Sequence, residues 1–98
     1  MNMYNPPHPG EFIKETYIKP LKVSLRMAAL KLNVSPSTFS RLVKGKSDIS
    51  PEMALKLSKT FGRSPESWMR MQANYELWLA KKKVNLDFVG VIYTAVHV

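Results

Sequence analysis

The sequence contains no cysteine and only two histidines. Without thiols, neither a disulfide framework nor a thiolate metal site can form. His8 and His97 lie near opposite ends of the chain, and the seven acidic residues are scattered. No nucleophile–base pairing and no metal-ligand spacing is visible in such a pattern. We therefore expect neither an enzyme nor a protein that binds a metal or another cofactor.

Signals for export and for membrane insertion are also missing. No apolar stretch approaches the roughly 18–20 residues needed to cross a bilayer. The first twelve residues lack the basic region and apolar run of a secretory signal. A chain of 98 residues is enough for one domain with a modest core. We expect a single cytoplasmic domain.

Acidic residues are absent from the whole stretch 16–47, although the chain has seven of them. The same stretch holds seven of the fifteen basic residues, and the net charge is +8. These seven are Lys19, Lys22, Arg26, Lys31, Arg41, Lys44 and Lys46. Solvated helix surfaces usually mix charges of both signs, so this pattern favours contact with a polyanion such as nucleic acid.

Helix boundaries are marked by serine, proline, asparagine and glycine. A serine can cap the free N–H groups of a first turn, and a proline fits the first helical position. Such pairs occur at Ser35-Pro36, Ser50-Pro51 and Ser64-Pro65, and Ser24 offers a fourth cap. Asn33, Gly45 and Gly62 are suited to helix ends. The sequence predicts helices near 9–17, 24–32, 36–44, 51–61 and 65–82, with Pro20 stopping the first, and short links favour an all-α bundle.

Helical spacing predicts the apolar core. Its expected members are Phe12, Ile13, Tyr17, Leu21, Leu25, Ala28, Ala29, Leu32, Val34, Phe39, Leu42, Met53, Leu55, Leu57 and Phe61.

The last fifteen residues differ from the rest, because they are rich in β-branched and aromatic side chains and carry one charge, Asp87. This composition favours a strand, which would need a partner strand. We expect residues 1–83 to form the domain and residues 84–98 to form an apolar tail. The tail would pair with a second copy, pair with a partner protein, or pack as an irregular segment.

The stretch 24–45 has the organisation of a helix-turn-helix. Two short helices flank a turn, and the small Ala29 lies where they must cross closely. The exposed positions of the second helix carry hydroxyl groups and one arginine, which suit the reading of base edges. We therefore predict base contacts from Ser37, Thr38, Ser40 and Arg41, and phosphate contacts from Arg26, Ser35, Lys44 and Lys46.

Residues 32–46 resemble the XRE-type, phage-repressor helix-turn-helix, whose common wording LxVSxSTxSRLxxGK they share. Further segments resemble the HigA-type antitoxins, also called the VapI or addiction-module antidote family, over roughly residues 8–83. They are His8-Pro9-Gly10-Glu11, Ile18-Lys19-Pro20-Leu21, the stretches 49–55 and 61–68, and Gln72, Tyr75, Leu77 and Trp78. The resemblance implies a five-helix lambda-repressor-like fold. It also implies a homodimer that represses its own operon at a palindromic operator and neutralises a HigB-like toxin, an mRNA endonuclease.

Three positions depart from the family pattern. Leu25 stands where many of these repressors have a glutamine that braces a phosphate. Asn33 replaces the usual turn glycine, which asparagine tolerates because it enters the left-handed region readily. Pro36 occupies a position often used to read bases, so that contact is not expected here.

The last predicted helix carries an aromatic stripe, which suits a core or a homodimer interface. We predict interface contacts from Trp68, Tyr75, Trp78 and Leu79. Two other functions stay open: a stand-alone prophage-type or metabolic repressor without a toxin, and an RNA-binding protein. The second is weaker, because the basic stretch lacks exposed aromatic side chains on which unpaired bases could stack.

Overall fold

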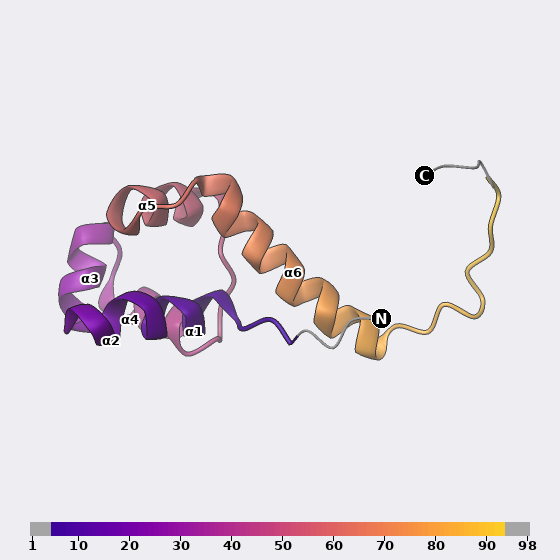
Figure 1. Ribbon diagram of the computed structural model, residues 1–98, viewed down its shortest axis with the longest axis horizontal. Coiled ribbons are helices and arrows are strands. Elements are labelled where there is room, and N and C mark those ends of the chain that lie inside the picture. The colour runs from indigo at the N-terminus through magenta and orange to yellow at the C-terminus, as the bar shows by residue number, and fades with distance from the viewer. Residues whose placement is uncertain (1–4, 94–98) are drawn as a thin grey trace.

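A computed structural model of the chain describes residues 5–93, and every regular element in that range is helical. The elements are α1 (Pro9–Ile13), η1 (Lys14–Ile18), α2 (Lys19–Leu21), α3 (Leu25–Leu32), α4 (Pro36–Val43), α5 (Pro51–Phe61) and α6 (Pro65–Lys83). Because α1, η1 and α2 run on without a break, they form one helix (Figure 1). The predicted all-α, five-helix, lambda-repressor-like fold is confirmed.

The prediction that Pro20 ends the first helix is wrong. Residues 14–18 form a π-helical turn, and the N–H of Lys19 donates to the carbonyl oxygen of Lys14. A proline in an α-helix would clash with the carbonyl group four residues before it. The wider π turn displaces the carbonyl groups ahead of Pro20, so the helix continues to Leu21. It ends at Lys22, which adopts the left-handed conformation with φ 56°.

The four predicted serine caps are confirmed. Each side-chain oxygen accepts the backbone N–H three residues ahead, which satisfies a donor that the helix itself cannot pair. The pairs are Ser24 with Met27 at 3.0 Å, Ser35 with Thr38 at 3.1 Å, Ser50 with Met53 at 3.1 Å, and Ser64 with Ser67 at 3.0 Å. Four of the helix starts therefore agree with the sequence to within one residue.

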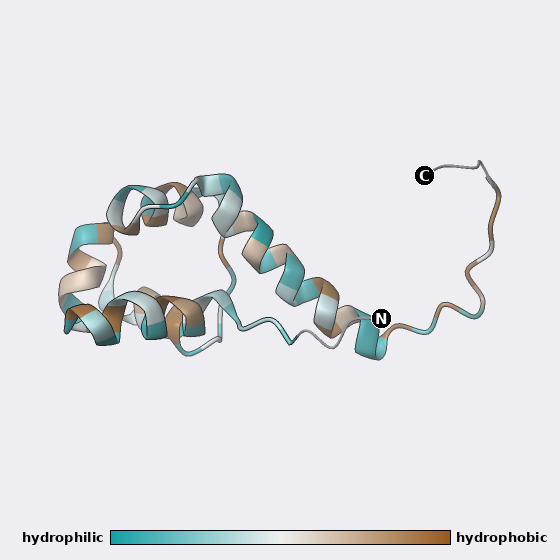
Figure 2. Cartoon of the chain, viewed as in Figure 1, coloured by the Kyte–Doolittle hydropathy of each residue, from teal (hydrophilic) through white to brown (hydrophobic). Residues whose placement is uncertain are grey.

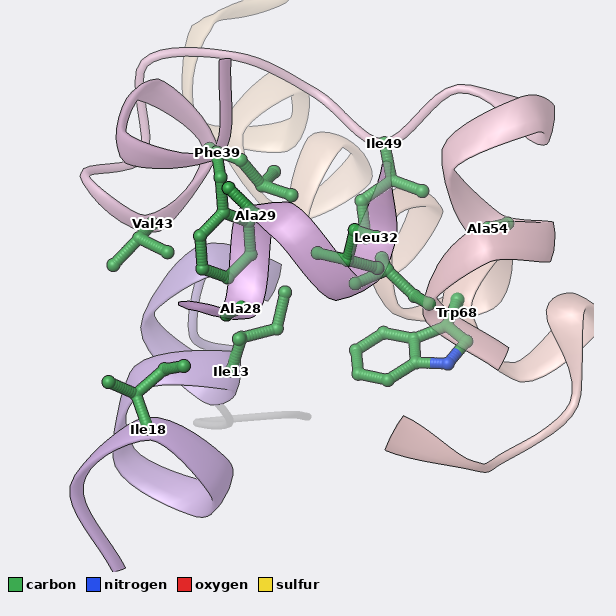
Figure 3. Close-up of a cluster of buried hydrophobic side chains, with 12 residues drawn as sticks. Ile13, Ile18, Ala28, Ala29, Leu32, Phe39, Val43, Ile49, Ala54 and Trp68 are labelled. Carbon is green, nitrogen blue, oxygen red and sulfur yellow. The ribbon is translucent and has the colours of Figure 1, made fainter. Parts of the chain in front are cut away.

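The core lies where α1, α3, α4, α5 and the start of α6 meet (Figure 3). Its largest buried side chains include Trp68, Phe39 and Ile13. Most predicted core residues are buried or pack against this cluster. Leu21 and Leu55 are exceptions, at 62% and 61% exposed.

These two exceptions have simple geometric reasons. Leu21 belongs to the extra turn that follows Pro20, beyond the part of the helix that packs on the core. On α5, Ala54 and Leu57 face inward. Leu55 follows Ala54 by one residue, which rotates it about 100° around the helix axis away from that face.

Helix α6 is the longest element, with 19 residues. It begins against α5 and α1, and its second half leaves the bundle, as Figure 1 shows. The hydropathy colouring of Figure 2 shows mixed apolar and polar residues along this projecting half. No helix in the described part of the chain is both long and apolar enough to cross a membrane.

The predicted strand does not form in the described part of the tail. Residues 84–93 run away from α6 without strand or helix (Figure 1). All ten are exposed, and Phe88 and Ile92 are almost completely so. A strand requires a second strand to pair with its backbone, and the described chain supplies none. The rest of the tail, 94–98, lies outside the described residues.

Candidate nucleic-acid interface

Helices α3 and α4 form the two arms of a helix-turn-helix. The turn between them depends on Asn33, whose φ of 58° places it in the left-handed region. The N–H of Val34 then donates to the carbonyl oxygen of Ala29 at 3.0 Å, which closes the end of α3. Ala29 is fully buried at the crossing, as the sequence predicts. A larger side chain there would force the two helices apart.

One face of α4 holds it to the core and the other face is free. Phe39, Leu42 and Val43 are buried. Three of the four predicted base-reading residues, Ser37, Thr38 and Arg41, are exposed, and Ser40 is half-buried. The outer face of α4 therefore offers hydroxyl groups and one guanidinium group to a partner.

Hydroxyl groups at the start of α4 bond to one another. The hydroxyl of Ser35 donates to Oγ1 of Thr38 at 2.8 Å while its oxygen accepts the N–H of the same residue. The Oγ of Ser37 lies 3.2 Å from that of Ser35. The Ser35 hydroxyl already donates its hydrogen to Thr38, so the predicted donation to a phosphate would require the Ser35–Thr38 bond to break. The Thr38 hydroxyl accepts from Ser35, so its own hydrogen is not used in this bond.

The end of α4 is fixed by a tight turn that carries Lys44 and Lys46. Gly45 has φ 77°, and the N–H of Lys46 donates to the carbonyl oxygen of Arg41 at 2.8 Å. From the other side, Gly10 of α1 approaches so closely that a Cβ atom there would lie 1.8 Å from the carbonyl oxygen of Leu42. Both lysines are exposed on a backbone that has little freedom to move.

His8 supports the same turn from the start of α1. Its Nδ1 accepts the N–H of Gly10 at 2.8 Å, so it caps α1. The ring is buried, lies beside Gly45, and meets the ring of Tyr75 edge-on with centroids 5.0 Å apart. His8 thus joins α1, the end of α4, and α6.

The cations of the predicted interface have no acidic partners among residues 5–93. Two ion pairs exist there, Lys19 with Glu15 at 2.9 Å and Lys56 with Glu52 at 3.2 Å. The hydrogen bond from Lys19 holds the pKa of Glu15 below its usual value. Lys19 is therefore neutralised locally. Arg26, Arg41, Lys44 and Lys46 are exposed and unpaired, which leaves their charge available to an anionic partner.

Sequence and structure comparisons place the chain among known proteins. The helix-turn-helix family matches residues 14–68. The chain belongs to the helix-turn-helix family. A relative is the HTH-type transcriptional regulator YddM of Escherichia coli, which is 44% identical over 87 residues, covering 89% of this chain and 92% of the relative.

Two solved structures resemble the chain closely in their fold. A HigA-family addiction module antidote protein of Coxiella burnetii superposes with a TM-score of 0.84 at 29% identity, over 92% of this chain and 100% of that one. Protein PA4674 of Pseudomonas aeruginosa, solved in complex with its operator DNA, gives 0.81 at 29% identity, over 92% and 97%. The predicted resemblance to XRE-type and HigA-type proteins is confirmed.

Gln72 links α6 of this helix-turn-helix protein to the segment that follows α4. It is 4% exposed, and its Oε1 accepts the backbone N–H of Ile49 at 2.9 Å. Its amide nitrogen donates to Asp48 and to Glu76, each at 3.1 Å. The sequence analysis named Gln72 only through the family resemblance, although its place four residues after Trp68 puts it on the same side of α6.

The aromatic stripe of α6 divides into core and surface. Trp68 is fully buried, donates its Nε1–H to the carbonyl oxygen of Gly62 at 2.9 Å, and packs on Phe12. Its assignment to a dimer interface is wrong, because it has no surface left to offer a second chain. Tyr75, Trp78 and Leu79 are half-buried, and their interface role stays a prediction.

Proposed function

We propose that the chain is a sequence-specific DNA-binding antitoxin of a type II toxin–antitoxin module that represses its own operon. One observation carries the DNA-binding part: the outer face of α4 presents Ser37, Thr38 and Arg41 between unpaired cations. An exposed helix of this composition suits the major groove, which admits one α-helix and presents a distinct pattern for each base pair. Its relative PA4674, seen with operator DNA, supports this reading.

In the proposed complex Arg41 pairs with a guanine, and the hydroxyl groups of Ser37, Thr38 and Ser40 reach neighbouring base edges. Phosphates are held by Arg26 at the start of α3 and by Lys44 and Lys46 after α4. Ser35 contributes by capping α4 and orienting Thr38 rather than through a free hydroxyl. These contacts assign specificity to α4 and general affinity to its flanks.

The proposed mode of DNA binding calls for a dimer. A single short helix reads few base pairs, so repressors of this type place two such helices about 34 Å apart on a palindromic operator. Helix α6 projects from the bundle and carries the half-buried Tyr75, Trp78 and Leu79. We propose that two chains associate through this projecting half, with the described tail near the contact.

The antitoxin part rests on the antidote protein of Coxiella burnetii, whose fold this chain shares over 92% of its length. The proposed toxin is HigB-like. A second candidate, a repressor without a toxin, is favoured by the relative YddM, which is described as a transcriptional regulator.

Two experiments separate these possibilities. The first is a gel-shift titration with the DNA upstream of the gene and with a scrambled duplex of equal length, which tests DNA binding alone. The second expresses the neighbouring open reading frame with and without this chain. Toxicity that the chain relieves supports the antitoxin, whereas specific binding without rescue supports the lone repressor. Equal affinity for both duplexes would contradict either form of repression.

A further inference from the structure

A small pocket lies between the start of α6 and the segment ahead of α1, apart from the predicted DNA-binding residues. Its volume is about 250 Å³. The lining residues are Pro6, Pro7, Phe12, Arg63, Ser67, Arg70, Met71 and Asn74. None of them lies within 24–46, and none was predicted to meet a second chain. The proposed repressor function therefore leaves this pocket without a role.

Arg63 forms part of the pocket wall, and contacts with its neighbours hold its side chain in place. It adopts φ 66°, a conformation that residues with side chains rarely take. Its Nε donates to Oγ of Ser67 at 3.1 Å, and its guanidinium carbon lies 5.1 Å from the centroid of the Phe12 ring. These contacts use one N–H group and the flat face of the guanidinium. The terminal N–H groups remain available, and holding them in place in advance lowers the entropic penalty of binding.

The second cation of the pocket, Arg70, lies on the exposed side of α6. Among residues 5–93 neither arginine forms an ion pair, and the remaining residues contain no Asp or Glu. Two guanidinium groups therefore flank an apolar wall built by Phe12, Met71 and two prolines. Guanidinium groups match the planar geometry of a carboxylate better than any other side chain does.

We propose that this pocket docks an acidic segment of a partner protein. A Glu or Asp carboxylate would lie between Arg63 and Arg70, with an adjacent apolar side chain against Phe12 and Met71. The pocket is smaller than the roughly 300–1,000 Å³ of small-molecule sites, which suits one or two side chains. The same side of α6 continues to Leu77, which is 58% exposed and extends the contact along the helix.

The direct test is an NMR titration of the full ¹⁵N-labelled chain with two short peptides. The probes are acetyl-Leu-Glu-Leu-amide and its neutral counterpart acetyl-Leu-Gln-Leu-amide. We expect saturable shifts of the amide signals of Phe12, Ser67 and Met71 with the acidic peptide, and binding about tenfold weaker with the neutral one. Equal binding of both peptides, or shifts without saturation, would overturn the proposal.

Variants identify the residues responsible. Arg70→Gln, at an exposed site, should weaken the acidic peptide about tenfold. Its matched control, Lys59→Gln, removes an exposed cation from α5 outside the pocket and should bind as the parent chain does. Ser67→Ala keeps both charges but frees the Arg63 side chain, so a loss of about threefold is expected.

Two outcomes would reject a partner protein as the occupant. If Lys59→Gln weakened the peptide as much as Arg70→Gln did, attraction to the overall positive charge would explain the binding. If Arg70→Gln changed self-association in light scattering while peptide affinity stayed constant, the pocket would belong to an interface between two copies of this chain.

Discussion

At the residue scale, Gly10 shows how closely the first helix approaches the predicted reading helix. A Cβ atom at this position would lie 1.8 Å from the carbonyl oxygen of Leu42 and 2.7 Å from its carbonyl carbon. Both are backbone atoms, which a rotamer change cannot move. The end of α4 is therefore positioned by the absence of a side chain on α1.

Gly10→Ala should consequently push α1 and α4 apart. Overpacking of this kind destabilises by about 1–3 kcal/mol or more, and we expect a loss of at least that size in urea unfolding. Gly90→Ala is the control, because a Cβ atom there meets nothing within 4 Å and should leave the urea midpoint unchanged. Equal stability of the two variants would show that α1 does not hold α4 in this way.

Several residue-level features could be predicted from the sequence because their causes are local. A serine just ahead of a helix can accept the backbone N–H three residues further on, and four serines of the described chain do so. Burial was harder to predict. Helical spacing puts Trp68 and Trp78 on neighbouring parts of the α6 surface. Trp68 is buried in the core and Trp78 is not, because the second half of α6 leaves the bundle.

At the element scale, α6 holds the segment between α4 and α5 through Gln72. The N–H of Ile49 is buried, and Oε1 of Gln72 is its acceptor. The same glutamine bonds to Asp48 in this segment. One buried side chain thus fixes the backbone that follows Lys44 and Lys46.

Gln72→Ala should leave the N–H of Ile49 without a partner. A buried unpaired donor typically costs about 1–3 kcal/mol, so the free energy of unfolding should fall by that amount. In hydrogen exchange the amide of Ile49 should lose protection before the amides of α5 do. Asn74→Ala, at an exposed site on the same helix, should change stability by less than about 0.5 kcal/mol. A similar effect in both variants would contradict this role for Gln72.

Element boundaries were predictable where capping residues mark them and not where tertiary context decides. Pro20 usually stops a helix, but the π turn before it lets the helix continue. The β-branched residues after Lys83 favour extended backbone, and residues 84–93 are indeed not helical. A strand also needs a partner strand, which composition alone does not reveal.

At the scale of the whole molecule, the projecting half of α6 is the proposed contact between two chains. Leu79→Glu places a charge on its half-buried side, and burying an unpaired charge is strongly unfavourable. We expect light scattering to report a monomer at concentrations where the parent chain is a dimer. Ala73→Glu, at an exposed position on α6, should remain dimeric. A dimer in the Leu79→Glu variant would place the contact elsewhere.

Charge distribution is the second whole-molecule feature. The net charge is +8, and the stretch 16–47 holds no acid to offset its cations. The excess of positive charge can be read directly from the sequence, and the helix-turn-helix that carries it could be predicted. The sequence could not show that Lys19 is paired with Glu15, or that the Ser35 hydroxyl donates its hydrogen to Thr38.

In the proposed complex the outer face of α4 reads the DNA sequence while its flanks bind phosphates. Fluorescence anisotropy can test it by titrating Arg41→Ala and Lys44→Ala against the operator and a scrambled duplex at several salt concentrations. Arg41→Ala should lose about 1–3 kcal/mol on the operator alone. Lys44→Ala should weaken both duplexes equally and lower the salt slope by about one unit. Unchanged operator affinity and selectivity in Arg41→Ala would contradict sequence reading by α4.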